Sequence, residues 1–170
     1  MNLIVSAAVL VVLLGAMAAC QDDDGESSTA TDPVGATPLE FTEQGGCGDA
    51  YFWTTTADDE HAVVISAELR DRSETEETVL EVDLPDPAVD VFLWEGAGLR
   101  SLMCNDVIEG EVTEETPVVE GHLTITLQPR PEGSIDLVDG KAVLTDLVAE
   151  DGTELPDLDL KTTSIGFYAG

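Results

Sequence analysis

From residue 39 onward, the chain is dominated by short runs in which apolar and polar residues alternate. Val63, Ile65, Ala67 and Leu69 form one such series, and similar series occupy residues 80–84 and 123–127. Because successive side chains of a strand point to opposite faces, a period of two predicts strands with one buried face. Further strands are expected at 50–55, 89–94, 101–105, 141–149 and 158–168. No segment after residue 19 sustains the 3.6-residue period of a helix.

Turn-forming residues separate these runs. Asp151-Gly152 predicts a tight hairpin and Asp139-Gly140 a weaker one, while Pro85 and Pro87 keep two strands apart. About eight short strands without helical crossovers predict an all-β domain over residues 39–170, an antiparallel β-sandwich. A closed barrel is the alternative architecture.

One strand carries two aromatic residues on its outward side. Val91 and Leu93 share a face with Val89, so Phe92 and Trp94 must point to the other face. Either a nearby loop covers these two side chains, or they form an exposed aromatic patch rimmed by acidic residues. The second arrangement is typical of a contact surface for a protein or glycan. Phe92 and Trp94 are therefore the candidate partner-contact residues.

The charge of the chain excludes some functions. It has 36 Asp and Glu against 6 Lys and Arg, a formal net charge of −30. Nucleic-acid binding is excluded because phosphate contacts require basic residues. Attraction of the protein surface to anionic lipid is disfavoured for the same reason. A hydrophobic content of 43% is sufficient for a packed core.

The N-terminal residues predict export. Residues 3–19 carry no charge and are short for a membrane span of about 20 residues, but they suit the apolar region of a secretory signal. Met17-Ala18-Ala19-Cys20 resembles the lipobox of bacterial lipoproteins. That resemblance implies a signal peptide over residues 1–19 and lipid attachment at Cys20. Two alternatives stay open: cleavage after Ala18, which releases a soluble protein, and an uncut membrane anchor.

Residues 20–38 contain one Val and no other large apolar residue, besides many Asp, Ser, Thr, Gly and Pro. Such a composition cannot bury enough surface to offset the entropy of ordering, so it predicts a flexible acidic linker after the lipidated Cys.

The number of cysteines predicts a disulfide. The chain has three, and an unpaired thiol is unfavourable in an oxidising compartment. If Cys20 carries lipid, Cys47 and Cys104 remain as one pair, which export favours in its oxidised form.

The sequence also resembles small β domains of uncharacterised envelope lipoproteins. The resemblance lies in GCGDAYFW from Gly46, CNDVI from Cys104, GHLTITL from Gly121 and AVLTDLV from Ala142. It implies a fold but no activity.

No catalytic or metal-binding motif is present. The sequence lacks a G-x-S-x-G elbow and an EF-hand loop, and neither His61 nor His122 has a nearby His or Cys in the sequence. Both histidines are expected at or near the surface. We therefore predict no catalytic residue, metal or cofactor, although a calcium site in one of the acidic loops stays open.

Together these features predict a lipid-anchored protein on the extracytoplasmic face of the cell membrane. Its β domain would have a non-catalytic binding or structural role, with an envelope protein or glycan as partner and no nucleic acid. The alternative is an enzyme, or an enzyme accessory, acting on an envelope polymer through an acidic cleft.

Overall fold

A computed structural model describes residues 38–69, 73, 75–106, 109–130, 134 and 136–166. The chain divides into two units, Met1–Ala36 and Thr37–Gly170, and every described residue belongs to the second. The predicted signal segment, Cys20 and all of the predicted linker except Pro38 lie outside the described residues. The elements are β1 (Phe41–Cys47), β2 (Tyr51–Thr56), β3 (His61–Ala67), β4 (Thr78–Leu84), β5 (Val89–Ala97), the 3-10 helix η1 (Leu99–Leu102), β6 (Glu111–Leu127), β7 (Val138–Ala149) and β8 (Leu158–Ile165).

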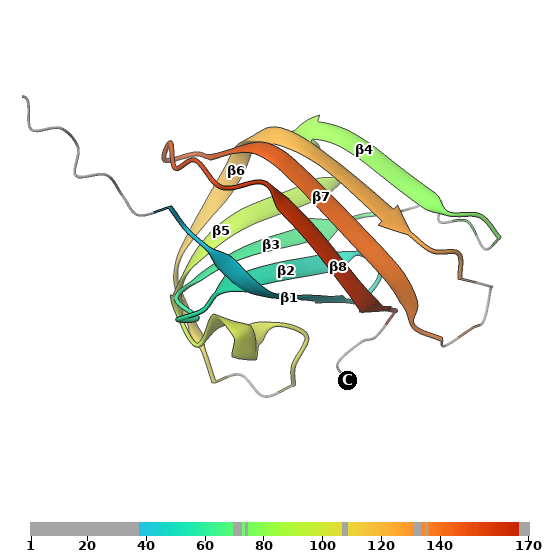
Figure 1. Ribbon diagram of the computed structural model, residues 1–170, viewed down its shortest axis with the longest axis horizontal. Coiled ribbons are helices and arrows are strands. Elements are labelled where there is room, and N and C mark those ends of the chain that lie inside the picture. Colours follow the sequence, from blue (N-terminus) through green and yellow to red (C-terminus); the bar gives the residue numbers. More distant parts are fainter. Residues whose placement is uncertain are drawn as a thin grey trace, which may run out of the picture. The chain divides into compact units, whose positions relative to one another are not determined.

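The described residues form an all-β fold of eight antiparallel strands, as the sequence predicted (Figure 1). The strands follow the order β1-β2-β3-β5-β6-β7-β8, and β4 pairs with β6. The long strand β6 joins the two halves of the fold, because its first part pairs with β5 and its second part lies between β4 and β7. The two ends of the sheet, β1 and β8, approach each other, so the sheet is nearly closed.

The main core lies between the two halves and is filled by the inward residues of the alternating runs. Val63 and Ile65 of β3 are fully buried, as are Leu123, Ile125 and Leu127 of β6. These are the residues whose period of two predicted burial. Strand β3 differs from the prediction in one respect: Ala62 and Val64, on its outward side, are buried as well. A second layer therefore covers this strand.

Residues 101–105 do not form the predicted strand. The chain forms the 3-10 helix η1 and a bend there, closed by hydrogen bonds from Ser101 N to Gly98 O and from Met103 N to Arg100 O. Leu99 and Met103 bury their side chains against the outside of the sheet instead of extending it. A short apolar run can belong to a strand or to a covering segment, and periodicity alone does not separate the two.

The two Asp-Gly pairs have different structures. The hairpin at Asp151-Gly152 is present: Gly152 N donates to Ala149 O, and Ala149 N donates to Thr153 O. The weaker hairpin predicted at Asp139-Gly140 is wrong, because both residues lie inside β7. Gly140 has another role. A Cβ at this position would lie 2.7 Å from a side-chain carbon of Ile165, so glycine allows β7 to pack tightly on the core.

Candidate functional site

Phe92 and Trp94 lie on the outward side of β5, as predicted, but a loop covers them. They are partly buried in a second apolar cluster, on the opposite side of β2, β3 and β5 from the main core. We call this the outer cluster. Its members are Tyr51, Trp53, Ala62, Val64, Phe92, Trp94, Leu99, Leu102, Met103 and Val112. Of the two arrangements that the sequence allowed, the structure therefore has the covered one.

Residues 97–106 supply this cover, and we call them the covering segment. Leu99 is fully buried and Met103 almost so, and the Tyr51 hydroxyl lies 3.3 Å from the Met103 sulfur. Burial raises the pKa of Tyr51 to about 12, because the phenolate loses hydration. At the start of the segment, Arg100 N donates to an Asp59 carboxylate oxygen over 2.8 Å.

The other end of the covering segment is attached through the predicted cysteine pair. The structure brings Cys47 of β1 and Cys104 to disulfide distance, with their Cα atoms 6.0 Å apart. Arg100 also lies 3.8 Å from the Glu43 carboxylate of β1. The segment is thus fixed to the sheet by a covalent link, polar contacts and apolar burial.

The second notable feature is the seam where the sheet fails to close. Among the described residues, β1 and β8 share no strand pairing, only single contacts such as Lys161 N donating to Gln44 Oε1 over 3.3 Å. The strands are nevertheless close, because Gly46 has no side chain. A Cβ at Gly46 would lie 2.8 Å from the Thr162 methyl group. The seam therefore leaves no room for another strand.

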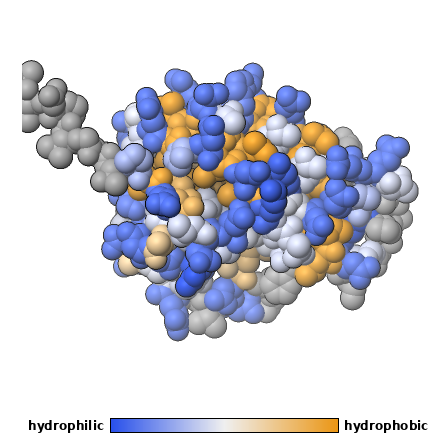
Figure 2. All heavy atoms as spheres, in the orientation of Figure 1, coloured by the Kyte–Doolittle hydropathy of each residue, from blue (hydrophilic) through white to orange (hydrophobic). Residues whose placement is uncertain are grey.

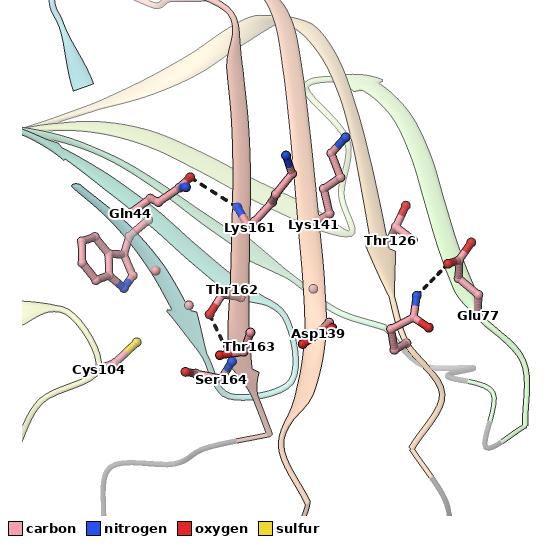
Figure 3. A pocket seen from close by; sticks show the side chains of 15 residues that line it. Gln44, Glu77, Cys104, Thr126, Asp139, Lys141, Lys161, Thr162, Thr163 and Ser164 are labelled. Carbon is pink, nitrogen blue, oxygen red and sulfur yellow. Dashed lines mark hydrogen bonds between the residues drawn. The ribbon is translucent and has the colours of Figure 1, made fainter. Parts of the chain in front are cut away.

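A groove of about 930 Å³ runs over this seam (Figure 3). It extends from Gln44–Gly46 of β1 across β8 and β7 to Thr126 and Gln128 at the end of β6. The indole of Trp53 and the sulfur-bearing Cys104 line one end, so the groove borders the covering segment. Figure 2 shows that polar residues cover much of the same side of the molecule, with apolar areas between them.

One row of outward side chains crosses the groove from strand to strand. Thr126 pairs with Lys141, and Lys141 pairs with Lys161. Gln44 continues the row across the seam by its contact with Lys161 N. A second group lines the groove beside this row and consists of hydroxyl, amide and carboxylate side chains: Glu77, Gln128, Asp139, Thr162, Thr163 and Ser164.

The charges of the groove are spatially separated. Figure 3 shows the ammonium groups of Lys141 and Lys161 pointing the same way, with Asp139, Thr163 and Ser164 at the opposite end. Both ammonium groups contact one carboxylate: Lys141 Nζ lies 3.4 Å and Lys161 Nζ 3.5 Å from Asp159. On the far side, Gln128 Nε2 donates to Glu77 over 2.8 Å. The groove therefore offers cations at one end and acceptors at the other.

The remaining sequence candidates lie apart from the groove. His122 is exposed and contacts Asp83, and His61 Nε2 lies 3.9 Å from Glu95. Within the described residues, no group of three or more His, Cys, Asp or Glu side chains is arranged to hold a metal ion. A hydrogen bond from Thr56 lowers the pKa of the exposed Asp58, whose carboxylate also accepts the Glu60 N–H.

Sequence reasoning assigned a ligand-binding role to none of the groove residues, and of these it singled out only Cys104 as a site residue, for the disulfide, although one signal for the groove exists. Lys141 and Lys161 are the only lysines of the chain, and they are equidistant from Asp151 in the sequence. A hairpin centred on Asp151-Gly152 places them opposite each other. The contribution of Gln44 has no comparable signal, because it depends on the approach of β1 to β8.

Comparison with known proteins adds no relationship: no family model, curated protein or solved structure matches the chain. Among the residues that the structure describes, no helix has the length and apolar character needed to cross a bilayer.

Proposed function

We propose that this chain is a lipid-anchored protein on the extracytoplasmic face of the cell membrane, and that its β domain is a non-catalytic binding module. The groove over the β1–β8 seam is the ligand site. The observation that carries the proposal is the lining of this groove, in which hydroxyl, amide and charged side chains and the Trp53 indole meet in one concave surface. Small-molecule sites are typically concave and combine a few placed polar groups with an aromatic wall.

The proposed location has separate support. Residues 3–19 have the length and composition of a signal's apolar region, and Cys20 follows two alanines. The pairing of Cys47 with Cys104 fits an oxidising compartment. Replacement of Cys20 by Ser should release the protein from the membrane or leave its precursor uncut. A wild-type protein recovered in soluble form with Ala19 at its N-terminus would contradict the anchor.

The binding role can be tested by sedimentation of the purified full-length protein with envelope polymer from which the lipid has been extracted, so that the proposed lipid anchor cannot cause co-sedimentation. Thr163→Trp should weaken co-sedimentation, because Thr163 is exposed on β8 and a large ring there would occupy part of the groove. Thr113→Trp is the matched control: Thr113 is also an exposed strand threonine, but it lies outside the groove. Equal binding by the two variants would remove the groove from the proposal, and no binding by the wild type would contradict the proposed function.

The alternative, an enzyme or an enzyme accessory acting on an envelope polymer, depends on the carboxylates of Glu77 and Asp139, which both line the groove. Glu77 is engaged by Gln128, and the same groove contains both lysines of the chain. These contacts favour binding over acid–base chemistry. Release of new reducing ends from envelope polymer by the wild type, and not by Asp139→Asn, would favour the alternative.

A further inference from the structure

The two lysines stand out against the charge of the whole chain. In a protein with 36 acidic residues, its only two lysines face each other on neighbouring strands and both line the groove. Like charges directly opposite each other across a strand pair are destabilising. The arrangement therefore works against stability unless an anion lies between the two ammonium groups.

Asp159 is the anion that occupies this position. It lies two residues before Lys161 on the same face of β8, and it contacts Lys141 and Lys161 through different carboxylate oxygens. The side chains of Asp159 and Lys141 are about half exposed, and that of Lys161 is 65% exposed. Exposed ion pairs of this kind are weak, typically below about 1 kcal/mol, so they exchange readily with an external carboxylate.

We propose that the groove accepts a carboxylated saccharide, whose carboxylate takes the place of Asp159 between the Lys141 and Lys161 ammonium groups. This inference rests on the proposed binding function of the groove. It adds the chemical class of the ligand and the two residues that select it.

The rest of the lining favours a saccharide. Thr126, Thr163 and Ser164 offer hydroxyl groups that both donate and accept hydrogen bonds. Trp53, on whose ring Gly45 packs closely, adds an apolar border at one end of the groove. An extended peptide that pairs with the sheet does not fit the seam, because Gly46 and Thr162 already approach too closely for an inserted strand.

The net charge of the protein does not prevent such binding. At 0.1 M salt, exposed charges are screened beyond about 10 Å, so the ligand's carboxylate interacts mainly with its immediate neighbours. At one end of the groove these are the two ammonium groups, with the displaced Asp159 carboxylate beside them, and at the other end lies Asp139. Asp139 disfavours a second position for the carboxylate and so fixes the direction in which the ligand lies.

The minimal probe is acetate, with acetamide as its uncharged counterpart, titrated into the full-length protein and followed by the NMR signals of the Lys141 and Lys161 side chains. Acetate should shift both signals and acetamide neither. Asp159→Asn should strengthen acetate binding, because it removes the competing carboxylate. Acetate without effect on either lysine, or acetamide with an equal effect, would overturn the proposal.

The saccharide is tested with trigalacturonate and its methyl ester. We expect trigalacturonate to bind more tightly than acetate, and the ester to bind about fivefold more weakly than the acid, the equivalent of one exposed ion pair. Lys141→Gln and Lys161→Gln should each cause a similar loss. Arg100→Gln should cause none, because Arg100 is an exposed cation outside the groove.

The outcomes separate this inference from the proposed function. Envelope binding that depends on Thr163 but is unchanged in both lysine variants would refute the carboxylate clamp and leave the binding module standing. Acetate binding without tighter binding of trigalacturonate would refute the proposal that the ligand is a saccharide. Unchanged far-ultraviolet circular dichroism of each variant shows that a lost signal does not come from unfolding.

Discussion

Two outer faces of the same fold have opposite character. The face of β2, β3 and β5 carries aromatic and aliphatic side chains, among them Trp53, Val64 and Trp94, and the covering segment packs over it. The face of β6, β7 and β8 carries Thr, Lys and Asp side chains and is hollowed by the groove. The alternation that fills the main core is the same in both. The outward residues therefore decide which face is covered and which remains open to solvent.

The largest loss of stability is expected on the covered face, from removal of the cysteine pair. Replacement of both Cys47 and Cys104 by Ser should lower the free energy of unfolding by about 4 kcal/mol in the chain-entropy model, since the closed loop is long. Urea unfolding measures this loss. Both tryptophans of the chain, Trp53 and Trp94, belong to the outer cluster. Their fluorescence should therefore shift toward the emission of solvated indole if the cover loosens before the core unfolds.

The control for this prediction is the wild-type protein treated with a reducing agent, which should reproduce the loss without any substitution. A reduced protein with unchanged stability and unchanged fluorescence would show that apolar burial of Leu99 and Met103 is sufficient to hold the covering segment.

Substitution of Trp94, which lies beneath the covering segment, tests how much this ring contributes to the stability of the outer cluster. Trp94→Ala should cost about 3 kcal/mol, because it removes a large side chain from an apolar cluster. Trp94→Phe should cost much less. The Trp94 indole N–H is buried without a hydrogen-bond partner among the described residues, so its loss removes an unfavourable group. A Trp94→Ala variant of full stability would mean that the cover does not depend on this ring, and would return Trp94 to the candidate partner contacts.

Tyr51 makes the cover sensitive to alkaline pH. Burial raises the pKa of Tyr51 to about 12 in the folded protein, against 10.0 for the unperturbed group. The unfolded chain therefore loses this proton first, and stability that is fully present below pH 10 decreases as the pH rises toward 12. The loss should reach about 2 kcal/mol. Tyr51→Phe should abolish this part of the pH dependence, and equal alkaline slopes in the two proteins would contradict the assignment to Tyr51.

Features that depend on a local sequence pattern were predictable, whereas features that depend on contacts between distant segments were not. Inward residues such as Ile65 and Ile125 were predictable because alternation is a local pattern with one structural reading. Strand β1 was missed, since its sequence FTEQGGC contains mostly polar residues and glycine, and six of its seven residues are only partly buried or exposed. Residues 101–105 of the covering segment were mistaken for a strand because SLMCN is short and apolar enough for either a strand or a covering segment.

The groove was not predictable in full for a different reason. The opposition of Lys141 and Lys161 follows from one hairpin and could have been read from the Asp151-Gly152 turn. The remainder requires β1, near the start of the domain, to meet β8 at its end, and no local pattern encodes that meeting. Gly46 was visible in the sequence as one of two adjacent glycines, but its close approach to Thr162 is a property of the closed fold.

The smallest expected changes in stability are those caused by substitutions on the open face. The prediction concerns which of these substitutions costs more. Lys141→Gln or Lys161→Gln should each change the free energy of unfolding by less than about 0.5 kcal/mol, because each removes one exposed ion pair and also relieves the repulsion between the lysines. Asp159→Asn should cost more, about 1 kcal/mol, because it leaves two ammonium groups opposite each other without an anion. In a Lys161→Gln background, the same Asp159→Asn change should cost almost nothing, and the difference between the two costs is the coupling. Urea unfolding of these four variants and the wild type at low salt gives the free energies of unfolding for this double-mutant cycle. High salt should reduce each of the differences. A Lys161→Gln variant destabilised by 2 kcal/mol or more would mean that the lysine pair holds the strands together, and the contrast between a covered face that stabilises the fold and an open face that does not would fail.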